Sequence, residues 1–375
     1  MISARKEREK AILVGVATRD VTLKRAKEHL AELGRLADTA GAQIMDEVLQ
    51  RRPAFDPSTL VGAGKAREIQ DLVGQHEADL VIFDEDLSGA QAKNLEEVIH
   101  AKILDRSGLI LDIFARHART SEAKIQVEVA QLQYLLPRLT RAWTHLSRQA
   151  GGVGIGMRGP GETQLEVDRR SIRKRIAELK KKLEKVESIR ASQRKHRSDT
   201  FHVALVGYTN AGKSTLMNAL TQAGVEAVDK LFATLDPTTR KLWLGPRREA
   251  VLSDTVGFIR KLPVGLISSF KSTLSVVSQA SYILNVVDIS SDDFEEQMEI
   301  TARILEELGV TEAPRLRVFN KIDLLEPERL EFLRERFPEA AFVSAEGKIG
   351  LEDLCEKLAE GCDHAAFEER VAETL

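Results

Sequence analysis

The stretch 207–214, Gly-Tyr-Thr-Asn-Ala-Gly-Lys-Ser, has the residue types and spacing of a phosphate-binding loop. It follows the apolar run 203–206 and leads into a segment of helical character. Backbone N–H groups in such a loop curl around an anion, and the start of the next helix adds partial positive charge. Lys213 can reach the β- and γ-phosphates of a nucleotide, and the Ser214 hydroxyl can ligate Mg²⁺. The alternative is an ordinary strand, turn and helix, and the motifs that follow argue against it.

Three further motifs each follow an apolar run that predicts a strand. In Asp-Thr-Val-Gly at 254–257, the aspartate can hold Mg²⁺ and the glycine N–H can meet a γ-phosphate. In Asn-Lys-Ile-Asp at 320–323, the Asp323 carboxylate can accept two hydrogen bonds from guanine, whereas adenine would leave it unpaired. Ser-Ala at 344–345 suits a loop whose backbone recognises guanine O6. Together these motifs indicate a guanine-nucleotide site.

The segment 231–240, Leu-Phe-Ala-Thr-Leu-Asp-Pro-Thr-Thr-Arg, is placed where a loop that senses the γ-phosphate must lie. One of its threonines must supply a second Mg²⁺ ligand, and we expect Thr234, with Thr238 as the second choice. The predicted Mg²⁺ ligands are Ser214 and Thr234, and the predicted catalytic residues are Lys213, Thr234 and Gly257. The predicted nucleotide-binding residues are Gly207, Asn210, Ala211, Gly212, Lys213, Ser214, Thr215, Phe232, Thr234, Asp254, Gly257, Asn320, Lys321, Asp323, Ser344 and Ala345.

Upstream, residues 11–111 alternate predicted strands and helices. Strands are expected at 11–16, 43–49 and 79–83, and helices at 21–40, 65–76 and 91–100. This alternation is typical of a parallel sheet with helices packed against it. The predicted fold class is α/β: an N-terminal α/β domain with a long antiparallel helical hairpin, followed by a P-loop domain with a mostly parallel sheet flanked by helices.

Two short motifs in the N-terminal domain have a functional and a plain interpretation. Val-Gly-Ala-Gly-Lys at 61–65 resembles a phosphate loop but lacks the spacing before Gly-Lys, so a glycine turn that leads into a helix is favoured. The acidic run 84–86 follows a predicted strand and can hold a metal, but no further acidic partner stands out. We expect it to be a solvated turn that caps the next helix.

Two long amphipathic helices are predicted between the two domains. Apolar residues recur at spacings of three and four within 120–146 and again within 172–190, which suits an antiparallel hairpin. Pro137 removes a backbone donor, so we expect a kink there. The polar, basic stretch 190–199 is expected to form the boundary before the phosphate loop.

The connection 148–161 between these helices contains six glycines, which predicts a tip without regular structure. Residues 138–197 carry 17 Lys and Arg against 6 Asp and Glu, although the net charge of the whole chain is −3. A basic segment on an acidic body suggests a polyanionic partner, and a solvated helix face is the alternative. The predicted RNA-contacting residues are Arg148, Arg158, Gly159, Arg169, Arg170 and Arg173.

Composition argues against several other classes of protein. No apolar run is long enough to span a bilayer, and the N-terminus lacks the apolar core of a signal peptide. Cys355 and Cys362 lack metal-ligand spacing and suit a reducing cytoplasm, and the 8 histidines form no zinc motif. We expect a cytoplasmic monomer with no membrane span. The predicted domains are an N-terminal α/β domain at 1–118, a basic arm at 119–197 with its tip at 148–161, a P-loop domain at 198–363 and a short acidic tail at 364–375.

These motifs resemble the Obg–HflX branch of the translation-factor class of P-loop GTPases. The resemblance rests on 207–214, 232–239, 254–260 and 320–323, while 61–65, 105–114 and 158–166 are similar to the HflX family itself. It implies a GTPase that uses Mg²⁺, hydrolyses GTP to GDP and phosphate, and binds the large (50S) ribosomal subunit and its 23S rRNA. It also implies that the GTP-bound state splits stalled or idle 70S ribosomes. Members of this family are also described as binding ATP and remodelling RNA.

Two residues shape the expected mechanism within that family. Many GTPases have a glutamine after Asp-x-x-Gly to orient water, but this chain has Phe258, so we expect slow hydrolysis that ribosomes stimulate. In some relatives an asparagine at the position of Asn210 helps to hold K⁺ near the phosphates, and a turn-forming role is the equal alternative. Three functions stay open: a ribosome-splitting GTPase, a GTP-controlled rRNA-binding switch or subunit-assembly factor, and an ATP-dependent RNA remodeller. The guanine motif argues against the last.

Overall fold

The computed structural model describes residues 8–139, 164–194, 201–221, 231–232, 234–246, 248–263, 276–310 and 313–374. The chain divides into two compact units. The first comprises Met1–Arg116 and Ile125–Glu184, and the second comprises His117–Lys124 and Lys185–Leu375. A short segment between two parts of the first unit therefore belongs to the second unit.

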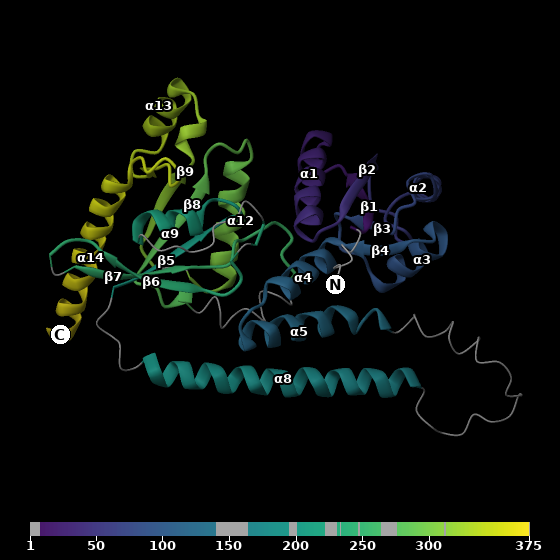
Figure 1. The fold of residues 1–375 in the computed structure, drawn as a ribbon, viewed down its shortest axis with the longest axis horizontal. Coiled ribbons are helices and arrows are strands. Elements are labelled where there is room, and N and C mark those ends of the chain that lie inside the picture. The colour runs from purple at the N-terminus through teal and green to yellow at the C-terminus, as the bar shows by residue number, and fades with distance from the viewer. Residues whose placement is uncertain are drawn as a thin grey trace, which may run out of the picture. The chain divides into compact units, whose positions relative to one another are not determined.

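The first unit contains a four-stranded parallel sheet in the order β2-β1-β3-β4, which agrees with the predicted α/β class. Strand β1 is buried from Ala11 to Ala17, because its apolar side chains alternate between the two faces of the sheet. Helix α1 lies on one side of the sheet, and α2 and α3 lie on the other (Figure 1). The elements are β1 (Lys10–Ala17), α1 (Leu23–Thr39), β2 (Gln43–Arg51), α2 (Ala63–His76), β3 (Leu80–Phe83), α3 (Gly89–Ile99), β4 (Lys102–Asp105) and α4 (Arg106–His117).

The acidic run 84–86 differs from its expected role as a solvated helix cap. Asp84 is buried and accepts a hydrogen bond from Arg106 Nη1 at 2.8 Å, and Glu32 accepts one from the same guanidinium. Arg106 is itself fully buried, so these two carboxylates compensate a charge that has left water. Helix α3 is capped instead by Ser88 in a capping box with Gln91. No cluster of three or more His, Cys, Asp or Glu residues that suits a metal occurs in the described ranges.

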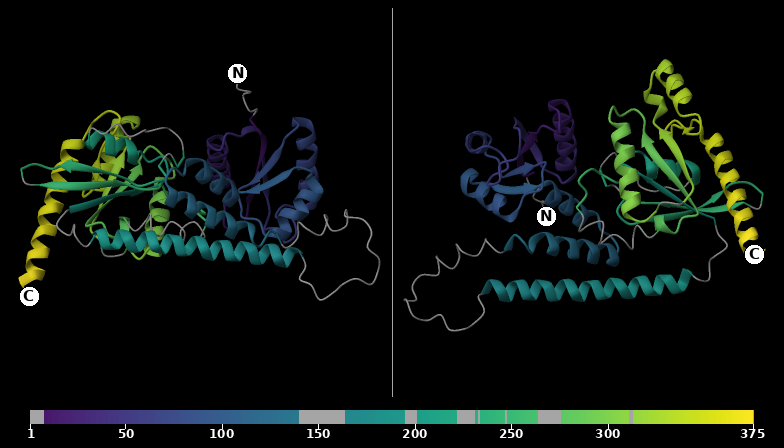
Figure 2. Two further views of the ribbon diagram at one scale, coloured as in Figure 1. Left: turned by 60° about the horizontal axis from the view of Figure 1, so that its bottom comes forward. Right: turned by 180° about the vertical axis from the view of Figure 1, so that it is seen from behind.

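Helices α5 (Ser121–Leu135) and α8 (Gln164–Arg194) lie side by side in all three views (Figures 1 and 2). An ion pair of 2.8 Å between Arg175 and Glu128 joins them. The expected kink at Pro137 is a helix end instead: α5 stops at Leu135, because a proline restricts the residue before it as well as itself. Helix α8 continues to Arg194, so the predicted boundary stretch 190–199 begins as helix. The predicted tip, 148–161, lies outside the described residues.

The second unit contains a six-stranded sheet in the order β10-β9-β8-β5-β7-β6, in which only the pairing of β6 with β7 is antiparallel. Helices α9 and α14 pack on the sheet through apolar residues such as Met217 and Leu358. Strands β5, β7, β8 and β9 run parallel, so their carboxyl ends meet at one edge, where ligands of such sheets bind. The elements are β5 (Phe201–Gly207), α9 (Lys213–Thr221), β6 (Thr238–Trp243), β7 (Glu249–Asp254), β8 (Tyr282–Asp288), α12 (Phe294–Glu307), β9 (Arg315–Asn320), η1 (Ile322–Leu324), α13 (Pro327–Arg336), β10 (Ala341–Phe342) and α14 (Leu351–Thr374).

The end of the chain differs from the prediction in one respect. The sequence predicts a helix to Glu360 and then an acidic tail, but α14 runs without a break from Leu351 to Thr374. A membrane-spanning helix, sufficiently long and apolar, is not found among the described residues.

Candidate nucleotide site

The phosphate loop connects the end of β5 with the start of α9, and its backbone depends on residues that tolerate a positive φ. Gly207 and Gly212 have φ values of +149° and +88°, and a Cβ on Gly212 would collide with the Asn320 side chain. Asn210 has a φ of 62°, in the left-handed region where asparagine is common. This geometry accounts for Asn210 as a turn residue.

Lys213 is the first residue of α9 and is buried. Its Nζ donates hydrogen bonds to Gly207 O at 3.2 Å and to Tyr208 O at 2.8 Å. Burial lowers the pKa of the Lys213 ammonium to about 8, and the charge of the Asp254 carboxylate opposes that shift. The loop carbonyls therefore hold an ammonium group beside the backbone that would surround a phosphate.

Three oxygen-bearing side chains from different segments meet beside Lys213. Ser214 Oγ lies 2.6 Å from Asp254 Oδ2 and 2.9 Å from Thr234 Oγ1, and Thr234 Oγ1 lies 3.0 Å from the same carboxylate oxygen. Burial raises the pKa of Asp254, and its Oδ1 is buried without a hydrogen-bond partner in the described structure. An unpartnered carboxylate oxygen beside two hydroxyls fits a hard divalent cation such as Mg²⁺. Thr238, the second choice, pairs with Asp254 in the β6–β7 ladder.

The segment after β7 packs directly on the phosphate loop. A Cβ on Gly257 would lie 2.7 Å from Thr209 Cα and 3.1 Å from Lys213 Nζ, so this approach requires glycine. Phe258 N donates to Gly207 O at 3.0 Å, and Thr209 N donates to Phe258 O at 2.7 Å. The Phe258 side chain is buried, so it fills space in the core at the position where many GTPases have a water-orienting glutamine.

Thr209 also fixes the segment that carries Thr234. Its Oγ1 accepts a hydrogen bond of 3.0 Å from Phe232 N. Phe232 has a φ of 57° and a buried side chain, so this predicted nucleotide contact packs into the core and has its N–H bonded to the loop. Sequence reasoning missed Thr209, because it occupies a variable position of the motif. The spacing of the motif carries no signal for its role.

Asn320, at the end of β9, joins the phosphate loop to the segment after β10. Its Nδ2 donates to Ala211 O and its Oδ1 accepts from Ala345 N, both at 2.9 Å. Lys321 adopts a φ of 67° and forms an ion pair of 2.7 Å with Asp288, a residue that sequence reasoning did not single out. These contacts bring two of the predicted motifs to one side of the phosphate loop.

The remaining predicted residues of the nucleotide site lie close by in the chain trace. Asp323 is exposed in η1, two residues after Lys321, so its carboxylate is accessible to a base. Ser344 is buried, and its Oγ accepts a hydrogen bond of 2.9 Å from Gly347 N, which shapes the loop that contains Ala345. Thr215 is half-buried in the first turn of α9.

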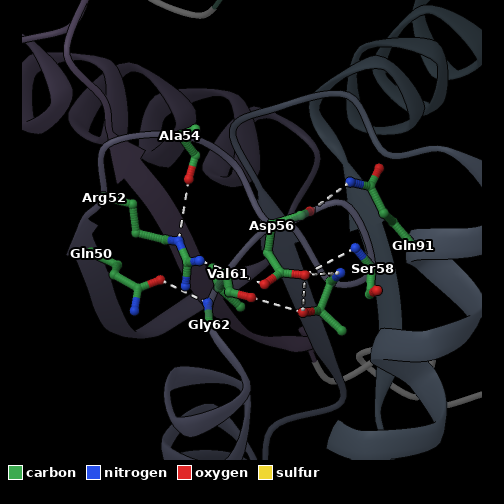
Figure 3. Close-up of polar contacts among 9 residues, drawn as sticks. Gln50, Arg52, Ala54, Asp56, Ser58, Val61, Gly62 and Gln91 are labelled. Atoms are coloured by element: carbon green, nitrogen blue, oxygen red, sulfur yellow. Dashed lines mark hydrogen bonds and ion pairs between the residues drawn. The ribbon is translucent and has the colours of Figure 1, made fainter.

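The glycine turn 61–65 in the first unit has its own intramolecular partners (Figure 3). Gly62 N donates to Gln50 Oε1 at 3.0 Å, and the Arg52 guanidinium lies where a Cβ on Gly62 would be. Arg52 also donates to Ala54 O and pairs with Asp56. These contacts agree with the plain interpretation, a turn that starts α2.

The predicted RNA-contacting residues are only partly described. Arg170 and Arg173 are exposed on α8, and Arg169 is half-buried there. Arg148, Arg158 and Gly159 lie outside the described residues.

Family models match three consecutive segments of this chain. Their descriptions are GTP-binding GTPase N-terminal for residues 27–115, GTP-binding GTPase middle region for 117–197, and 50S ribosome-binding GTPase for 202–321. The third segment contains the phosphate loop, the Mg²⁺-type cluster and Asn320.

Full-length relatives are similar to almost the whole chain. The protein named GTPase HflX of Caldanaerobacter subterraneus subsp. tengcongensis is 48% identical over 94% of this chain and 80% of its own length. GTPase HflX of Escherichia coli K12 is 46% identical, over 94% of this chain and 82% of its own. A crystal structure of SsGBP in complex with GDP has a TM-score of 0.51 and 25% identity, and covers 95% of this chain and 99% of its own. On this similarity and the site geometry, the chain belongs to the HflX family of GTPases.

Proposed function

We propose that this GTP hydrolase binds GTP and Mg²⁺ at the carboxyl edge of the second sheet, with Lys213 and the loop N–H groups on the phosphates. The observation that carries this proposal is the convergence of Ser214, Thr234 and Asp254 within hydrogen-bond distance of one another. Ser214 and Thr234 would supply hydroxyl ligands and Asp254 would orient them. Bound Mg²⁺ would neutralise developing phosphate charge. Asp323 would select guanine, with the loop of Ser344 and Ala345 against O6.

Hydrolysis by the isolated protein is slow in this proposal. Catalysis of phosphoryl transfer is mainly positioning, and the usual water-positioning glutamine is replaced by Phe258. The Phe258 side chain is buried, and both its backbone polar groups are bonded to the phosphate loop. A partner must therefore supply or order the group that positions water. Equal turnover of GTP with and without 50S subunits would contradict this.

The second part of the proposal is that the partner is the large ribosomal subunit, and that the GTP-bound protein splits stalled or idle 70S ribosomes in the cytoplasm. Support comes from the basic α8, on which Arg170, Arg173 and Lys174 are exposed. Such groups suit 23S rRNA phosphates, whose contacts set affinity and its salt dependence. Light scattering of 70S ribosomes tests splitting: scattering should fall with GTP or a non-hydrolysable analogue and stay constant with GDP.

Two alternatives give different results in the same assay. A GTP-controlled docking switch or assembly factor would co-sediment with 50S subunits while 70S scattering stays unchanged. An ATP-dependent RNA remodeller would require ATP to replace GTP, which the Asp323 carboxylate disfavours. As a check on the RNA contacts, Arg173→Ala should weaken 50S binding and reduce its salt dependence. Arg329→Ala, which removes a half-exposed arginine on α13, is the matched control.

Potassium is the open part of the metal chemistry. Two roles are considered for Asn210. Its φ of 62° suits a turn residue, and its side chain would be a K⁺ ligand that brings positive charge to the phosphates. Comparison of GTPase rates in K⁺ and Na⁺ buffers tests the K⁺ role: equal rates in the two buffers would leave Asn210 with the turn role alone. Gel filtration with light scattering tests the proposed monomer.

A further inference from the structure

Asp236 connects the segment that carries Thr234 to the two residues immediately before helix α5. Its carboxylate accepts hydrogen bonds from the backbone N–H groups of Arg119 and Thr120, both at 3.1 Å, and from the Thr120 hydroxyl at 2.5 Å. Thr120 Oγ1 in turn accepts from Ala123 N at 3.1 Å and so caps α5. Residues 117–124 belong to the same compact unit as the nucleotide site, so all of these contacts lie within one unit.

The chemistry of this contact favours a carboxylate at that position. Arg119 and Thr120 precede α5, so their N–H groups have no partner within the helix, and the nearby helix start carries partial positive charge. Hydrogen bonds to an ionised acceptor are about twice as strong as neutral ones. An aspartate that accepts three of them is held more firmly than a solvated surface carboxylate.

Asp236 is close enough in the chain to Thr234 to influence the cluster that Thr234 forms with Ser214 and Asp254. Two residues of extended chain span at most about 7 Å, so Asp236 and Thr234 cannot move independently over larger distances. Leu235 between them is buried. Two residues before Thr234, Phe232 N donates a hydrogen bond to Thr209 Oγ1. The Thr234 hydroxyl, 3.0 Å from Asp254, therefore lies between two anchors.

We propose that Asp236 is a positioning residue for GTP hydrolysis: bonded to the residues at the start of α5, it holds Thr234 in place beside Ser214 and Asp254. This inference rests on the proposed role of Thr234 as a Mg²⁺ ligand. Coupling of this kind is reciprocal, so a nucleotide that draws in Thr234 also stabilises the start of α5. The helix continues from Lys124 into the first unit, so the contact gives the arm a route to the nucleotide.

The test compares Asp236→Ala and Asp236→Asn with a matched control in the full chain. Glu249→Ala serves as control, because Glu249 is an exposed carboxylate in β7 that pairs with Lys241 in the neighbouring strand β6. We expect Asp236→Ala to lower kcat about tenfold, which is about 1.4 kcal/mol. It should also raise the Mg²⁺ concentration at half-maximal rate, and leave GDP affinity unchanged. Asp236→Asn keeps one acceptor oxygen and should lie between Asp236→Ala and the parent.

Two further measurements separate positioning from general stability. Hydrogen exchange at the amides of residues 119–123 should slow when Mg²⁺ and a GTP analogue replace GDP, and Asp236→Ala should abolish that difference. Thr120→Val combined with Asp236→Ala should cost less than the sum of the single changes, because both remove the same hydrogen bond.

Three outcomes would overturn the inference. One is a parent-like kcat and Mg²⁺ dependence in Asp236→Ala. Another is a parallel loss of GDP affinity and thermal stability, which would make Asp236 merely structural. The third is hydrogen exchange at 119–123 that does not respond to the nucleotide. Thr234→Ala distinguishes this failure from failure of the proposed site: if it loses hydrolysis while Asp236→Ala does not, the site stands and only the positioning role is wrong.

Discussion

Gly257→Ala probes the contact between the segment after β7 and the phosphate loop with a single added methyl group. The new Cβ would lie 2.7 Å from Thr209 Cα, 3.0 Å from Thr209 Cβ and 3.1 Å from Lys213 Nζ. The lysine terminus can move, but Thr209 Cα is backbone of a loop whose conformation the glycines fix. The segment with Gly257 must therefore move outward.

The size of the effect follows from that displacement. Non-bonded carbon atoms attract best at about 3.5 Å or more, so the segment must retreat by about 0.8 Å. The two backbone hydrogen bonds of Phe258, now 2.7 and 3.0 Å long, would then exceed hydrogen-bond length. Each such bond contributes about 1 kcal/mol net, so closure of this segment would cost about 2 kcal/mol. That cost corresponds to a fall of about thirtyfold in kcat/KM for GTP.

The assay is single-turnover and steady-state GTP hydrolysis, with GDP affinity measured in parallel. GDP lacks the γ-phosphate that the Gly257 N–H is proposed to meet, so its affinity should not change. Gly74→Ala is the matched control, because Gly74 lies in α2 with no atom near the added Cβ, and hydrolysis should be unaffected. A parent-like kcat/KM in Gly257→Ala would refute the reasoning. The close approach of Gly257 to Thr209 would then be absent from the conformation that hydrolyses GTP.

Three further predictions concern other parts of the molecule. Burial lowers the pKa of Lys213 to about 8 without nucleotide, and a bound phosphate would keep the ammonium protonated. Calorimetry should therefore show proton uptake on GDP binding, and GDP affinity about fourfold weaker at pH 8.5 than at pH 7. GDP binding that does not depend on pH would contradict this. Asn320→Ala removes the bonds to both neighbouring loops and should weaken GDP binding by about 1–3 kcal/mol in a fluorescence titration. Arg106→Ala leaves Glu32 and Asp84 buried without their cation, so urea unfolding should show a loss of about 3–5 kcal/mol.

Elements whose buried residues form a continuous apolar run in the sequence could be predicted. Strands β1 and β3 are continuous apolar runs, and their existence and approximate bounds were confirmed. Strand β4 was missed, because it has only four residues and two of them are not buried. Helix α4 was missed because Arg106 to Leu111 are all buried, which removes the periodic polar face by which a helix is identified.

Long-range polar contacts were beyond sequence reasoning for a different reason. Arg106 belongs to a residue type that is almost always exposed, and its partner Glu32 lies 74 residues away. Asp236 and Thr120 are separated by 116 residues, and nothing in either segment marks the other as a partner. The phosphate-loop motif, in contrast, encodes its geometry locally, so the positions of Lys213 and Ser214 could be expected from spacing alone.

The segment that carries Thr234 is held by two hydrogen-bonded contacts that reach different parts of the molecule, and this difference bears on how a partner could control hydrolysis. Its first anchor, the hydrogen bond from Phe232 N to Thr209 Oγ1, is made to the phosphate loop, where the nucleotide is proposed to bind. Its second anchor, Asp236 on the start of α5, lies at the base of the arm. If Asp236 positions Thr234 as we propose, a partner that moves the start of α5 would change the position of Thr234 without touching the nucleotide. Such a route would order the site from within the protein, so it needs no residue inserted into the site by the partner. If stimulation by 50S subunits survives in Asp236→Ala while basal hydrolysis falls, stimulation must act by another path.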